Sequence, residues 1–154
     1  MKRMLTIIGM ATLVGVASVA AAQPAPGRGI KWHGSGGWGM DSQYTRTYDV
    51  KAVETVSGTV VRVERITPMR GMSAGVHMIL KTDAGEVSVH LGPAWYIERQ
   101  DVKLAPGDMV QVKGARVTFQ GKPAIIAAEV KKGDEILPLR NDAGVPVWSG
   151  WRRG

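Results

Sequence analysis

Short stretches in which apolar and polar residues alternate dominate the chain from Glu54 onward, and glycine, proline and aspartate separate them. Successive residues of a β-strand point to opposite faces, so a period of two predicts strands with one face against a core. No long stretch has the 3.6-residue period of an amphipathic helix. The pattern therefore predicts five strands, at residues 55–66, 76–82, 86–91, 109–119 and 124–130.

One stretch, residues 94–100, has a composition suited to a helix, and Pro93 precedes it, as is favourable at a helix start. The predicted order is three strands, a short helix and two strands. This is the order of the OB-fold, an all-β, five-stranded Greek-key barrel with its helix between strands three and four. After residue 133 the pattern allows a short hairpin of residues 136–140 and 145–148.

The N-terminal residues predict a secretory signal peptide. Two positive residues, Lys2 and Arg3, precede an apolar run that ends in small residues at positions 18–22. An uncleaved membrane anchor is the alternative, because the run is nearly long enough to span a bilayer. No later segment is apolar enough to cross one.

We therefore expect a periplasmic protein without a transmembrane segment once the signal is removed. The predicted regions are the signal peptide (1–22), a Gly/Pro-rich arm (23–53), the OB-fold barrel (54–133) and a C-terminal hairpin and tail (134–154).

The composition limits the kinds of functional site that the chain can form. The chain has 154 residues, 20 Lys and Arg against 13 Asp and Glu, a formal charge of +7 and no cysteine. Without cysteine there are no disulfides, thiolate zinc sites, iron–sulfur clusters, cysteine nucleophiles or covalently attached haem. The positive charge favours acidic partners, and binding of this kind weakens with salt.

Several phrases carry a resemblance to known proteins: VHLGPAWYI (89–97), GDMVQVKG (107–114), KPAIIAAEV (122–130) and PVWSGW (146–151). With them the chain resembles secreted bacterial OB-fold proteins that carry a "DNA-binding" label. A looser likeness extends to bacterial OB-fold stress proteins and to OB proteins of magnetosome clusters. The resemblance implies the OB-fold, and nucleic acid as a partner by fold analogy. It implies no catalytic residues.

The outer face of strands two and three is the usual ligand surface of OB-folds. On the other face, the alternating apolar residues of both strands must point into the core, which restricts how the two strands can be paired. In the simplest pairings, the residue numbers of two facing residues sum to 167 or 169. His77 and His90 then lie opposite or diagonal to each other, and we expect both imidazoles to be exposed on one recognition surface. The core-facing residues are Val76, Met78, Leu80, Val87, Val89 and Leu91.

Two uses of this surface fit its residues. Arg70, Lys81 and Lys122 could hold an anionic polymer beside the histidines. Trp95, Tyr96 and Phe119 could stack on bases if they are exposed, but Trp95 and Tyr96 lie in the predicted helix, where packing into the core is favoured.

Alternatively, His77 and His90 could bind copper together with the thioethers of Met69 and Met72, because copper accepts both ligand types. Haem is the second cofactor considered. The leading expectation is that no cofactor is bound.

Four of the five tryptophans lie outside the predicted strands, at Trp32, Trp38, Trp148 and Trp151, and we expect them to dock on the barrel or on each other. The sequence has no G-x-S-x-G motif, no recognisable His–Asp arrangement and no paired carboxylates on one element. We therefore predict a non-catalytic module that recognises an envelope protein or an anionic polymer.

Overall fold

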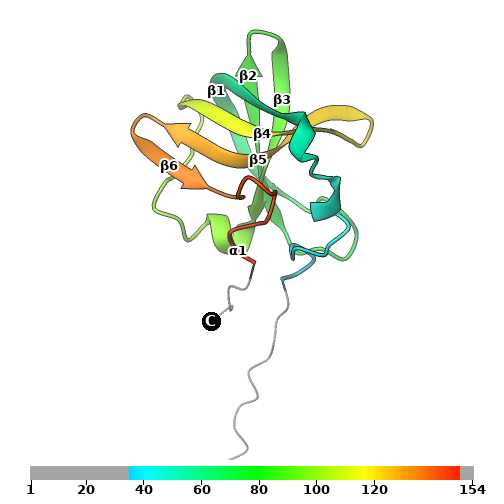
Figure 1. Cartoon of the computed structure of the whole chain (residues 1–154). Coiled ribbons are helices and arrows are strands. Elements are labelled where there is room, and N and C mark those ends of the chain that lie inside the picture. The colour runs from blue at the N-terminus through cyan, green and yellow to red at the C-terminus, as the bar shows by residue number, and fades with distance from the viewer. Residues whose placement is uncertain (1–34, 150–154) are drawn as a thin grey trace, which may run out of the picture. The chain divides into compact units, whose positions relative to one another are not determined.

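The computed structural model describes residues 35–149, and six β-strands form its main regular structure (Figure 1). The all-β class predicted from the alternating pattern is confirmed. The strands are β1 (Val53–Ile66), β2 (Gly75–Thr82), β3 (Gly85–Pro93), β4 (Met109–Phe119), β5 (Lys122–Lys132) and β6 (Glu135–Pro138). The helical elements are short: η1 (Thr45–Thr47) and η2 (Val50–Ala52) are 3-10 turns before β1, and α1 (Ala94–Ile97) follows β3.

The predicted signal peptide, Trp32 and Trp151 lie outside the described residues. Within residues 35–149, no helix has the length and apolar character needed to cross a membrane.

The predicted elements differ from the observed ones mainly at their ends. All five predicted strands are present, and most are slightly longer. The helix ends at Ile97 rather than at residue 100, because Arg99 N and Gln100 N donate to carbonyls three residues back and so continue as turns. The predicted C-terminal hairpin is present only in its inner part. Arg140 and Pro146 form an antiparallel bridge and Val147 N donates to the carbonyl oxygen of Leu139, whereas residues 136–138 pair as β6 with β5.

The sheet closes on itself through β1. The first half of β1 pairs with β4 as far as Thr59, and its second half pairs with β2. On the other side, β3 runs parallel to β5, with Ser88 opposite Ala124 and His90 opposite Ile126. Strands β1 to β5 therefore form a closed ring, and β6 is added at the edge of β5.

The ring encloses the core in the predicted register. Met78 faces Val89 and His77 faces His90, so the partner numbers sum to 167. The six alternating apolar residues of β2 and β3 are buried, as predicted: Val76, Met78, Leu80, Val87, Val89 and Leu91.

Two glycines allow β1 and β4 to bend tightly against their neighbours. A Cβ at Gly58 would collide with the carbonyl oxygen of Lys81, and a Cβ at Gly114 would collide with that of Ile126. Gly114 also adjoins a shift in the register between β4 and β5. These are the close-approach and bulge positions expected from glycine within a strand.

Replacing Gly114 with alanine should therefore destabilise the ring. The new methyl group would meet the backbone of β5, which cannot move without breaking the ladder, and we expect a loss of about 2–3 kcal/mol in the free energy of unfolding. Urea unfolding measures this loss. Gly121→Ala is the control: a Cβ there meets nothing within 4 Å, and only its φ of 76° is unfavourable, costing about 1 kcal/mol. A loss for Gly114→Ala no larger than for the control would contradict the close approach.

Candidate functional site

The register of β2 and β3 brings two imidazoles into contact. His77 and His90 face each other across the strand pair, and their ring centroids are 3.7 Å apart with planes inclined by only 12°. In an antiparallel ladder, facing residues that exchange no backbone hydrogen bonds have their side chains closer together than facing residues that do. The close stacking of the two imidazoles fits a pair of the first kind. The sequence prediction that the two histidines share one face of the sheet is confirmed.

The prediction that this face is open to solvent is wrong. His77 is 0% exposed and His90 is 1% exposed. The phenol ring of Tyr44 stacks on His90 with centroids 6.0 Å apart, and Phe119 presents its edge to His90 at 4.7 Å. The Tyr44 hydroxyl shares a hydrogen bond of 2.8 Å with Nδ1 of His90. Tyr44, which precedes β1, and Phe119, at the end of β4, therefore form a second layer over the predicted surface.

Residues 35–48, which we call the covering segment, supply most of this layer. Its anchor is Trp38, which is 0% exposed and donates from Nε1 to the carbonyl oxygen of Ser73. Trp148 donates from its own Nε1 to the carbonyl oxygen of Trp38 at 2.8 Å, and the two indole rings meet edge to face. The predicted docking of the tryptophans is confirmed for Trp38 and Trp148. The described part of the predicted Gly/Pro-rich arm therefore belongs to the packed structure.

Burial keeps both imidazoles neutral. Loss of solvation lowers the pKa of His77 to about 3, with a smaller contribution from the neighbouring His90, and lowers the pKa of His90 to about 4. Both ring nitrogens of His77 and Nε2 of His90 lack a hydrogen-bond partner. Buried polar groups are usually paired, so these three nitrogens are an exception at the centre of the predicted site.

The stacked arrangement does not let the two rings share one metal ion. The lone pair of an imidazole nitrogen lies in the plane of the ring, and nearly parallel planes 3.7 Å apart do not meet at a common point nearby. Among residues 35–149 there is also no group of three or more His, Cys, Asp or Glu side chains that could hold a metal. Met69 and Met72 line a different pocket, together with Arg70 and Tyr44.

The cationic residues predicted for the site do not gather around the histidines. Arg70 lies in the pocket with the two methionines, Lys81 lies at the far end of β2, and Lys122 begins β5. Trp95, Tyr96 and Phe119 could have served as a stacking platform only if they were exposed. Tyr96 is buried, Trp95 is half-buried against the core, and Phe119 packs against the histidines; these aromatic rings are used inside the protein.

Lys81 instead lines an open groove of about 590 Å³ between the middle of β1, the end of β2 and the start of β4, and its lining is polar and apolar in similar parts. Lys131 lies on the same groove, and Met109 is 79% exposed beside it. Lys81 forms no ion pair with any residue of the described part of the chain. The groove lining contains no aromatic residue; it consists of Ser57, Gly58, Thr59, Lys81, Thr82, Asp83, Met109, Val110, Gln111, Lys131 and Gly133.

Sequence reasoning missed Tyr44, Met109 and Lys131. The signal for Tyr44 was available, because a large aromatic ring in a Gly-rich segment rarely stays in water when a core is close by. Met109 and Lys131 carried no such signal. Their importance arises only because the fold brings the start of β4 and the end of β5 beside the middle of β1 and the end of β2.

The neutral histidine pair predicts a pH dependence of stability. Free histidine binds a proton near pH 6.5, whereas the folded protein holds the two imidazoles at pKa values of about 3 and 4. Between these values the unfolded chain binds more protons, so the free energy of unfolding falls as the pH falls. From pH 7 to pH 5 we expect a loss of about 2 kcal/mol per imidazole.

Urea unfolding at the two pH values measures this loss, and His77→Leu should remove about half of it. Equal stability of the unchanged protein at pH 7 and pH 5 would contradict a buried neutral pair.

No curated protein matches the chain. The family model of the MamS/MamX magnetosome protein family matches residues 52–137, from η2 through most of β6. This agrees loosely with the expected likeness to magnetosome-cluster proteins, whereas nothing supports the "DNA-binding" or stress-protein families named with it. Because the match covers more than half of the sequence, the chain belongs to the MamS/MamX magnetosome protein family.

Proposed function

We propose that this chain is a non-catalytic OB-fold module, exported to the periplasm, that recognises an acidic partner within a magnetosome-associated assembly. The partner is an envelope protein or an anionic polymer. Three kinds of support lead to this proposal. The family model supplies the magnetosome connection, and the charged N-terminus with its apolar run supports export. The ring order β1-β2-β3-β5-β4, with a helix between β3 and β4, supports the OB-fold.

The groove at Lys81 is the observation that carries the proposal. Its hydroxyl and amide side chains can exchange hydrogen bonds with a partner, while Lys81 and Lys131 supply positive charge. Lys131 has only a long contact of 3.9 Å to Glu129, so its charge is weakly compensated. Met109 adds an exposed apolar surface of an adaptable kind. Asp83 is the single acidic side chain of the lining.

The same groove argues against nucleic acid as the partner. Proteins that bind single strands place aromatic side chains where the bases can stack on them. The groove has no aromatic side chain, and the candidate rings Tyr96 and Phe119 are engaged in internal packing. A sulfated or carboxylated polymer, or an acidic protein surface, needs only the lysines and the hydrogen-bonding groups.

Heparin is a suitable probe of this groove because it is a polyanion without bases. We expect the purified protein to bind labelled heparin at low salt, and Lys81→Glu to weaken binding about fivefold, as is typical for reversing a charge in a binding site. Affinity should fall steeply between about 50 and 200 mM NaCl.

Arg99→Glu is the matched control. This substitution changes the net charge by the same amount as Lys81→Glu. Arg99 forms no ion pair within residues 35–149. Arg99 follows α1, which lies at the opposite end of the sheet from the β2–β3 turn (Figure 1). Equal weakening by Lys81→Glu and Arg99→Glu would reduce the effect to net charge and contradict a site at the groove.

Copper handling is the second candidate function, and the unbonded ring nitrogens of His77 and His90 favour it. Met69 and Met72 line the pocket that also contains Tyr44, the hydrogen-bond partner of His90. Imidazole and thioether together suit copper. One ring would have to turn out of the stack before a single ion could bind both histidines.

Copper titration tests this candidate on the purified protein. Stoichiometric binding that is lost in a His77→Ala variant and weakened by Met72→Leu would support it. Met109→Leu is the control, because this methionine is exposed on the separate groove. Binding that is absent, or that is insensitive to His77→Ala, would exclude copper from the histidine pair.

A further inference from the structure

Arg140 is a buried cation without an acidic partner. It follows β6 and is 6% exposed, and none of the ion pairs within residues 35–149 includes it. Its Nη1 donates to the carbonyl oxygen of Gly144 at 3.2 Å, while its Nε is buried without a hydrogen-bond partner. A guanidinium group carries five N–H donors, and a buried donor left unpaired destabilises the fold.

Two aromatic rings partly compensate the charge of Arg140. Its Cζ lies 5.4 Å from the centre of the Tyr48 ring and 5.3 Å from that of Trp148. Such contacts attract a cation electrostatically. Burial lowers the pKa of Arg140, yet a guanidinium stays protonated in proteins at neutral pH. Because π faces are poor acceptors for a directed N–H, hydrogen-bonding capacity remains at this group.

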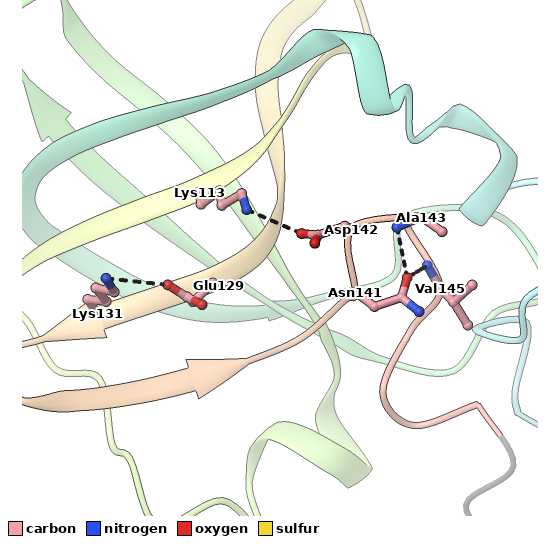
Figure 2. A network of polar contacts seen from close by, with 7 residues as sticks. All are labelled: Lys113, Glu129, Lys131, Asn141, Asp142, Ala143 and Val145. Atoms are coloured by element: carbon pink, nitrogen blue, oxygen red, sulfur yellow. Dashed lines mark hydrogen bonds and ion pairs between the residues drawn. The ribbon is translucent and has the colours of Figure 1, made fainter.

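Arg140 lines a cavity of about 230 Å³, together with Tyr48, Lys113, Glu129 and Asp142. Figure 2 shows the pairing of the two acids: Lys113 Nζ lies 3.4 Å from Asp142 Oδ1, and Lys131 Nζ lies 3.9 Å from Glu129 Oε1. Each carboxylate thus has a lysine within 4 Å, although the contact of Lys131 with Glu129 is long. Arg140 forms no ion pair with either carboxylate.

The turn beside the cavity is held independently of these charges. Asn141 Oδ1 accepts hydrogen bonds from the backbone N–H groups of Ala143 and Val145 at 3.0 and 2.9 Å (Figure 2). The side chain of Asp142 is 99% exposed, so its pair with Lys113 is of the kind that contributes little. Lys113 can therefore turn from Asp142 towards the cavity without disturbing the turn.

We propose that this cavity is an oxyanion site, in which Arg140 binds a carboxylate or phosphate group and Lys113 supplies a second positive charge. The planar N–H groups of an arginine match the oxygens of either anion. The volume suits phosphate or a small carboxylate. The site shares no lining residue with the groove at Lys81, so it is a second binding site beyond the proposed function.

Nuclear magnetic resonance of the Arg140 side-chain Nε–H group tests the proposal directly. The purified protein is titrated with inorganic phosphate or with acetate, and sodium chloride keeps the ionic strength constant. We expect a saturable shift of this signal. Saturation with phosphate alone assigns a phosphate ligand, and saturation with acetate alone assigns a carboxylate.

Two exposed residues supply variants that should fold normally and act in opposite directions. Lys113→Ala should weaken anion binding about threefold, and Asp142→Asn should strengthen it about threefold, because it frees Lys113 and removes a competing carboxylate. Lys122→Ala, at the β4–β5 turn, is the control and should change nothing.

No saturable shift with either anion would overturn the proposal. A shift that Lys113→Ala and Asp142→Asn both leave unchanged would mean an adventitious ion only, and would overturn it as well.

Discussion

An imidazole that is buried without a charged partner must be neutral, and this constraint determines how the face of β2 and β3 can be used. His77 and His90 are stacked, enclosed and largely without hydrogen-bond partners. The arrangement is stable only while water and protons are kept away, because a charged ring in this position would be strongly disfavoured. The covering segment provides that exclusion through Trp38 and Tyr44.

The covering segment also connects parts of the chain that are distant in sequence. Trp38 lies between the loop before β2, through Ser73, and the C-terminal region, through Trp148. The ring of Trp148 in turn lies against Tyr96 of α1 and the guanidinium of Arg140. The buried histidines and the buried arginine therefore depend on one aromatic cluster. The two surfaces proposed for recognition, the groove at Lys81 and the cavity at Arg140, are lined by residues outside the rings of Trp38, Tyr96 and Trp148.

The alternating pattern predicted the strands and the pairing of His77 with His90, because a one-residue slip would have turned Met78 and Val89 out of the core. The same pattern could not predict exposure. A strand face that is polar in sequence can meet solvent or a second layer of the same chain, and the second layer here comes from a Gly-rich segment with no period. Arg140 was also beyond prediction, since its surroundings combine Tyr48, Lys113 and Trp148 from three separate parts of the sequence.

The enclosure of the histidine pair can be tested most directly by chemical modification with diethyl pyrocarbonate, followed by mass spectrometry of the peptides that contain His77 and His90. The reagent attacks neutral, accessible imidazole nitrogens. We predict that both histidines remain unmodified in the native protein at pH 7 and react fully after unfolding in urea. Rapid modification of either histidine in the native protein would show that the covering segment does not seal this face, and would contradict the account.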